Sequence, residues 1–196
     1  MIRRYHATGL ITAVFLVLAR GLSAQAVDTT QRATLPPATK LEAFQPVAGQ
    51  VTTLGYDQLG LITPGMTVPA TLSVDVRQLQ GASSGVVRGV VIEIKTSVHT
   101  ARSFVDEDEL PELIKGIDAL LSVKSNPTNF TNFEVKYRTK GDLVLAAFNA
   151  SGDRIRFAVT AGRILTETRS IDESEMHKFR DWMDTAQKKL TSTQVK

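Results

Sequence analysis

The sequence contains no cysteine among its 196 residues. This absence excludes a disulfide scaffold, a thiol nucleophile, cysteine-ligated zinc, an iron–sulfur cluster and a lipid anchor on a cysteine. Glycine-rich loops of the kind that hold dinucleotides or phosphates are also missing. We therefore expect no cofactor. The overall composition, 42% hydrophobic and 22% charged, is ordinary for a globular protein.

Histidine is scarce as well. Beyond the segment 1–26 only His99 and His177 remain, and no His-Glu-x-x-His motif is present. Two isolated histidines do not make a metal site, and neither has the sequence neighbours of a catalytic base. We predict structural or surface roles for both, with no metal site and no catalytic residue.

The segment 1–26 has the three parts of a secretory signal peptide. Met1–Arg4 is basic, Gly9–Ala19 is a short apolar run, and Ala24-Gln25-Ala26 offers small residues for cleavage. An apolar run of this length is too short to cross a bilayer core of about 30 Å as a helix. We predict cleavage after Ala26, a secreted or periplasmic protein, and no stable membrane span after processing. The alternative is an uncleaved membrane anchor.

Charge is balanced once this segment is removed. The whole chain has a formal net charge of +3, but residues 1–26 carry three arginines and no acidic residue. Residues 27–196 therefore hold 20 basic and 20 acidic residues. A neutral, exported chain does not fit binding to nucleic acid by counterion release, so no nucleic-acid partner is expected.

The rest of the chain divides into a leader, one domain and a tail. Residues 27–38 are polar with a Pro36-Pro37 pair and predict a flexible leader. Residues 39–190 predict a single domain and 191–196 a tail; Leu41–Val47 is either a short helix or the approach to a strand. Alternating apolar and polar residues predict strands within Val51–Ile62, Thr71–Leu79, Val86–Thr96, His99–Val105, Phe133–Arg138, Leu143–Asn149, Arg154–Thr160 and Gly162–Arg169.

Two amphipathic helices follow the fourth and the eighth strand. Asp106 with Glu109, and Asp172 with Glu175, have capping-box spacing at the start of each helix. The two helix starts superpose at a constant offset, which predicts an internal duplication over about residues 48–124 and 130–190. The fold class is thus α+β, with antiparallel sheets from two ββββα units, each closed by one amphipathic helix.

Two resemblances accompany this pattern. The stretches Leu110–Asp118 and Phe130–Asp142, with the C-terminal capped helix, resemble uncharacterised exported bacterial proteins. That family has no assigned activity, so the resemblance implies no catalytic residues. In element order alone, two ββββα units look like the Whirly and Pur folds that bind single-stranded DNA. A shared fold does not transfer function.

Two short motifs invite a chemical interpretation. Gly81-Ala82-Ser83-Ser84-Gly85 matches Gly-x-Ser-x-Gly, but a nucleophile elbow needs a following helix and the next segment predicts a strand. A hairpin loop is the better interpretation. The acidic run Asp106–Glu109 lacks a calcium-loop pattern, and its place at a helix N-terminus accounts for its charge.

One set of residues suggests a binding surface. Lys136, Arg138, Arg154 and Arg156 occupy the polar positions of two predicted strands, and in one sheet they would share a face. Residues 131–196 carry three more basic than acidic residues, whereas residues 27–130 carry three fewer. The face could bind an anionic ligand, or it could be a solvated surface. Trp182 on the last helix could anchor a partner, although core packing is the simpler prediction.

These patterns together predict a non-catalytic binding or cell-envelope-associated module. Its partner would be an anionic envelope ligand, such as an acidic polysaccharide or a lipid head group, or another protein. The alternative is an extracytoplasmic hydrolase with a dispersed carboxylate pair, because a glycosidase needs only two acidic residues that spacing cannot reveal.

Overall fold

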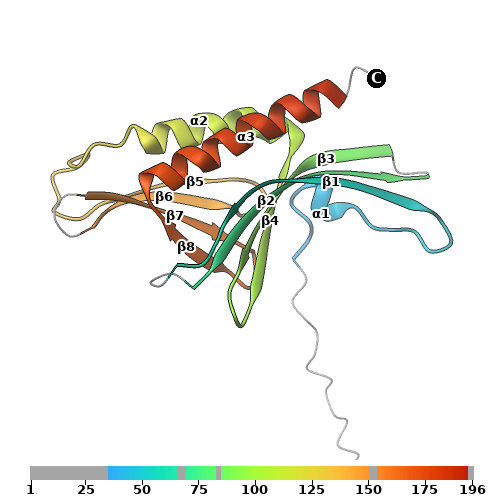
Figure 1. Cartoon of the computed structure of the whole chain (residues 1–196), viewed down its shortest axis with the longest axis horizontal. Helices are drawn as coiled ribbons and strands as arrows, with labels where there is room; N and C mark the ends of the chain where they lie inside the picture. Colours follow the sequence, from blue (N-terminus) through green and yellow to red (C-terminus); the bar gives the residue numbers. More distant parts are fainter. Residues whose placement is uncertain (1–34, 66–68, 83–84, 151–153, 194–196) are drawn as a thin grey trace, which may run out of the picture. The chain divides into compact units, whose positions relative to one another are not determined.

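The computed structural model describes residues 35–65, 69–82, 85–150 and 154–193. The chain divides into Met1–Leu35 and a second unit, Pro36–Lys196, which is described by itself. The predicted signal peptide at residues 1–26, the leader up to residue 34 and the Ser83–Ser84 pair lie outside the described residues. Figure 1 shows the order of the helices and strands along the chain.

The first sheet is an antiparallel meander of four strands. Its spatial order follows the sequence: β1 (Thr52–Ile62), β2 (Thr71–Gly81), β3 (Gly85–Lys95) and β4 (Thr100–Asp106). Alternation buries one face, where Leu72, Val74 and Val76 of β2 stand opposite Ile94, Ile92 and Val90 of β3. Branched aliphatic side chains suit this pleated, buried surface.

The second sheet repeats the arrangement. It contains, in order, β5 (Glu134–Arg138), β6 (Val144–Ala150), β7 (Arg154–Ala161) and β8 (Glu167–Ile171), all antiparallel. The predicted start of the last strand at Gly162 is wrong. Gly162 has φ +101°, and a Cβ there would lie 2.0 Å from the Leu165 carbonyl oxygen, so residues 162–166 form a turn that only glycine can open.

Helices complete an α+β fold. A short α1 (Lys40–Ala43) precedes the first sheet; a 3-10 turn (Glu107–Glu109) and α2 (Leu110–Leu121) follow it; α3 (Glu173–Thr193) follows the second sheet. The α3 helix continues beyond Leu190, where the sequence placed the end of the domain. None of the helices in the described ranges is long and apolar enough to cross a membrane.

The two predicted capping boxes have different outcomes. At α3 the prediction is confirmed: the Asp172 carboxylate accepts a hydrogen bond from the Glu175 amide at 2.8 Å, and the Asp172 amide donates to the Glu175 carboxylate at 3.0 Å. At α2 it is wrong. Asp106 makes no side-chain cap there and instead accepts from the Lys40 and Leu41 amides, at 2.8 and 3.1 Å.

Both helices lie along the same side of the sheets and pack against each other (Figure 1). Each also contacts strands of the sheet that it does not follow in sequence. The α2 helix contacts β5 and β6, whereas α3 contacts β1 and β3 in addition to β7. A single hydrophobic core therefore contains residues from both sheets and both helices.

The contact between α3 and β1 depends on Gly60. A Cβ at this position would lie 1.9 Å from the Trp182 indole, so the ring covers bare backbone. A β-bulge between Gln58 and Gly60 falls at the same point. Trp182 also meets Phe179 edge to face, with ring centroids 6.5 Å apart. Trp182 is thus packed against the core, as the simpler of its two interpretations predicted.

Candidate anion-binding face of the second sheet

The second sheet carries the four predicted basic residues on one face. Lys136 and Arg138 of β5, and Arg154 and Arg156 of β7, are all exposed. Strand register puts Lys136 opposite Ala146 and Ala146 opposite Ala158, two positions along β7 from Arg156. Because side chains alternate along a strand, all four project away from the buried Phe157 and Val159. We call these four residues the basic face.

Small side chains form the middle of this face. The row that begins at Lys136 continues through Ala146 and Ala158 to Ser170, across all four strands. One partly buried aromatic, Phe148, stands between Glu134 and Arg156 in the adjacent row. The result is a row of short side chains, of which Ala146 is buried and Ala158 and Ser170 are partly buried, with the cations at its margins.

The four cations differ in how far they are already neutralised. Lys136 pairs with Glu134 at 2.7 Å, and Arg138 pairs with Asp142. Within the described residues, Arg154 and Arg156 form no ion pair or side-chain hydrogen bond. Their side chains are the ones whose charge remains most available on this face.

Arg156 also acts on the start of α3 through space. The Glu175 amide and the Ser174 hydroxyl donate to Asp172 and lower the pKa of that carboxyl. The positive charge of Arg156 lowers the same pKa a little further. Since the two side chains form no ion pair, the Arg156 guanidinium stays exposed on the basic face.

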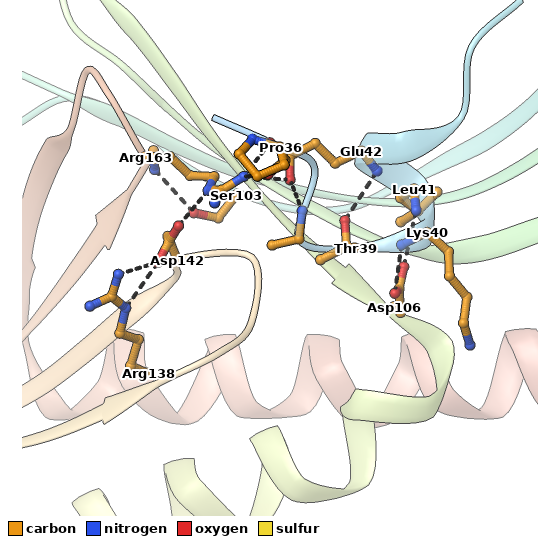
Figure 2. Close-up of polar contacts among 12 residues, drawn as sticks. Pro36, Thr39, Lys40, Leu41, Glu42, Ser103, Asp106, Arg138, Asp142 and Arg163 are labelled. Atoms are coloured by element: carbon orange, nitrogen blue, oxygen red, sulfur yellow. Dashed lines mark hydrogen bonds and ion pairs between the residues drawn. The ribbon is translucent and has the colours of Figure 1, made fainter. Parts of the chain in front are cut away.

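Asp142 joins the margin of the basic face to the next turn. This carboxylate lies in the β5–β6 turn at φ +60° and accepts from Arg138 and from Arg163 Nε, the latter at 2.5 Å (Figure 2). Burial alone would raise the pKa of Asp142, but the hydrogen bonds from the two guanidinium groups outweigh it and lower the pKa. Arg138 is therefore committed to an internal partner.

Arg163 extends the same network to the start of the described chain. Its Nη1 donates to the Pro36 carbonyl oxygen at 2.7 Å and to the Glu42 carboxylate at 3.2 Å (Figure 2). Hydrogen bonds to Asp142 and then Glu42 raise the pKa of this guanidinium further. One side chain thereby holds residues 36–42 against the turn that follows β5.

Sequence reasoning missed a buried arginine. Arg169 of β8 is 4% exposed and donates to the carbonyl oxygens of Thr63, at 3.0 Å, and Ala70, with Glu175 at 3.5 Å. It fastens the second sheet to both sides of the connection between β1 and β2. Its place in an alternating strand looks the same as that of an exposed arginine, so no sequence signal distinguished it.

The other candidate residues do not come together. His99 lies exposed at the β3–β4 turn and His177 is exposed on α3. Ser83 is outside the described residues, but β2 and β3 on either side of it are antiparallel partners, with Gly81 opposite Gly85. The Gly-x-Ser-x-Gly segment thus joins two strands rather than a strand and a helix.

A metal site or a catalytic carboxylate pair would need acidic side chains that come together within the described ranges. Groups of three or more metal-ligating side chains are absent there. In the hollow lined by Lys40, Arg88, Glu107 and Asp108, Lys40 pairs with Asp108 at 2.7 Å. That hydrogen bond lowers the pKa of Asp108, the opposite of what a general acid requires.

No protein-family model matches the sequence, and no curated protein matches it. Its function must therefore be argued from its own residues.

Proposed function

We propose that this protein is a non-catalytic binding module of the cell envelope whose basic face takes an anionic ligand. The observation that carries the proposal is the pair Arg154 and Arg156, exposed and without an ion-pair partner among the described residues. The ligand chemistry is carboxylate, sulfate or phosphate, as displayed by an acidic polysaccharide or a lipid head group.

The geometry supports a polymer or a surface more than a small molecule. The four cations lie on the exposed face of two strands, around a row of short side chains. Exposed guanidinium groups bind carboxylate and phosphate through paired hydrogen bonds. Each such contact contributes up to about 1 kcal/mol at an exposed site, so useful affinity requires several repeated charges.

The test measures binding of the purified protein to polygalacturonate and, separately, to vesicles containing an anionic phospholipid. The variant Arg154→Gln/Arg156→Gln is expected to weaken binding about tenfold, since two exposed charge pairs are lost. Added salt is expected to weaken the wild-type interaction as well. The probe that binds identifies the polysaccharide or the lipid as the source of the anion.

The matched control is Lys124→Gln/Lys178→Gln, which removes the same charge from two exposed positions outside the second sheet. It should retain wild-type affinity. If the control loses as much affinity as Arg154→Gln/Arg156→Gln, binding depends on the net charge of the protein and not on the basic face. A wild-type protein that binds neither probe would refute the proposal.

The proposed function in the cell envelope includes export of the protein, and we add a proposal on the origin of its two similar sheets. We infer that residues 1–26 act as a signal peptide cleaved after Ala26, which would bring the domain to the periplasm or the medium. We also infer two duplicated ββββα units in which each helix closes one sheet. The α2 helix of the first unit contacts β5 and β6 of the second sheet, and the α3 helix of the second unit contacts β1 and β3 of the first sheet. These contacts support an arrangement in which each helix packs on the sheet of the other unit.

The hydrolase alternative has no observation in its favour. Asp57 and Asp108, which line the described hollows, are held by lysine partners at 2.8 and 2.7 Å. No second function is therefore proposed.

A further inference from the structure

The strand β1 forms an open edge of the first sheet. It lies at one end of the order β1-β2-β3-β4, and it spans Thr52–Ile62. Thr53–Gln58 is a continuous run of exposed residues. The edge strands β4 and β8 differ, because β4 contacts β7 and β8 contacts β3 of the other sheet.

Along Thr53–Gln58 this edge has no lysine and no proline, and the β-bulge of β1 lies at the end of that run, between Gln58 and Gly60. Natural edges carry charged residues, especially lysine, or proline, which discourage pairing with another chain. The open edge β5 fits that rule, because Glu134, Lys136 and Arg138 alternate along it. In contrast, β1 has one charged residue, Asp57, which is paired with Lys189 of α3 at 2.8 Å.

An apolar stripe reaches the same edge. Leu54 and Tyr56 are 48% and 67% exposed and share the sheet face that points away from the core. Leu54 stands opposite Leu79 of β2, and Leu79 stands opposite Val87 of β3. Strand addition at this edge would therefore cover apolar side chains as well as unpaired backbone groups.

A hollow lies beside the middle of β1. It has a volume of about 400 Å³ and is lined by Gly55 of β1, Val76 of β2, and Lys189 and Leu190 of α3, among others. A Cβ at Gly55 would meet nothing within 4 Å. A side chain placed at Gly55 would therefore point into this hollow without a clash, so this position accepts a substitution.

We propose that β1 pairs antiparallel with β1 of a second copy of this chain, about a two-fold axis at Gly55. In this register Leu54 lies opposite Tyr56 of the second copy, so the two apolar stripes join on one face. Asp57 lies opposite Thr53 of the second copy, so no like charges meet. The result is a continuous eight-stranded sheet built from the first sheets of two protomers.

We favour a second copy of this chain as the partner of β1 because the residues of this edge can pair with the same residues of another copy. A two-fold axis satisfies the outward N–H and C=O groups of both strands with each other. The carboxylate of Asp57 is neutralised within its own protomer, so two copies do not repel. This inference is independent of the basic face, which lies on the other sheet.

The absence of native cysteine gives a clean test in the full-length protein purified from its host. At the two-fold axis the Cα atoms of paired strands lie about 4.5–5.5 Å apart, within disulfide range. The variant Gly55→Cys is expected to form a disulfide-linked dimer on mild oxidation at micromolar concentration. The control Phe130→Cys, at a position 81% exposed, is expected to stay monomeric under the same oxidation.

Light scattering after size exclusion gives the second readout. Wild-type protein is expected to have twice the monomer mass, and Leu54→Lys/Tyr56→Lys is expected to be monomeric because four lysines would meet at the axis. The control Val98→Lys, at another exposed apolar position, should leave the dimer intact.

Four outcomes would overturn the proposal. They are a monomeric wild type, a dimer unaffected by Leu54→Lys/Tyr56→Lys, a different protein seated on β1, and cross-linking of Gly55→Cys no faster than that of Phe130→Cys.

Discussion

At the scale of single residues, similar sequence patterns acquire different partners. Asp172 caps its own helix, whereas Asp106, with a glutamate at the same spacing, accepts amides from α1. The capping-box spacing is local and equal in both. The difference arises because the fold brings the amides of Lys40 and Leu41, which are distant in sequence, to Asp106. A carboxylate accepts the donors that the fold brings to it.

Asp142 gives a prediction about acid stability. Its lowered pKa means that its stabilising effect is complete above the unfolded-state pKa, about 3.9, and is lost as pH falls through the lower folded-state pKa. The variant Asp142→Asn, which tolerates positive φ, should lose about 2 kcal/mol at pH 7.

Urea unfolding of wild type and Asp142→Asn at a series of pH values measures this effect. The difference between the two proteins should shrink as pH falls below about 4, because the wild-type carboxylate is then protonated. A difference that stays constant with pH would show that Arg138 and Arg163 do not act on a charged Asp142.

At the scale of secondary structure, helix positions depend on single close contacts. The α3 helix lies on β1 because Gly60 leaves room for Trp182, and α2 lies on β5 because Gly116 leaves room for Tyr137. At Gly116 a Cβ would lie 2.5 Å from the Tyr137 ring. Both contacts join a helix to a strand of the sheet that it does not follow in sequence.

The variant Gly60→Ala is expected to destabilise the protein by about 1–3 kcal/mol, because an added methyl collides with the indole and forces α3 from β1. Thermal unfolding monitored by circular dichroism measures the loss. Gly65→Ala, outside the proposed β1 pairing, is the control, since its methyl would meet nothing within 4 Å.

The double variant Gly60→Ala/Trp182→Phe separates the collision from a backbone effect. A smaller ring should recover part of the stability lost in Gly60→Ala, measured against Trp182→Phe alone. If no stability returns, the cost at Gly60 does not come from the indole.

At the scale of the whole unit, the two sheets and the two helices share one core. The sheets are also joined by polar contacts: the Gly162 amide donates to the buried Ser103 hydroxyl at 3.0 Å, and Arg169 bonds the β1–β2 connection. The two ββββα units are therefore expected to fold together.

Cooperative unfolding is the resulting prediction. The single tryptophan reports the contact of α3 with β1, while far-ultraviolet circular dichroism reports all strands and helices. The two signals should give coincident urea transitions, as expected for one cooperative unit. The variant Leu113→Ala, at a position 0% exposed, should shift both together by about 2–5 kcal/mol. Separate transitions would show that the halves unfold independently.

The sequence by itself determined the number and kind of most elements. The alternation of Leu72, Val74 and Val76, the glycines that precede and follow the connection of β2 to β3, and the capping box at Asp172 are local signals, and local physics decides them. The common face of Lys136, Arg138, Arg154 and Arg156 also followed, because strand alternation fixes which side a residue takes once two strands share a sheet.

Only the tertiary structure decided which sheet each helix covers, which cations are neutralised and which edge stays open. Arg138 and Lys136 are committed to Asp142 and Glu134 while Arg154 and Arg156 are not, and Arg169 is buried although its strand pattern resembles theirs. These outcomes depend on contacts between residues distant in sequence. The alternation of residues along a strand does not predict such contacts. It indicates on which face of the sheet a side chain lies, but not which residues of other elements pack against that face.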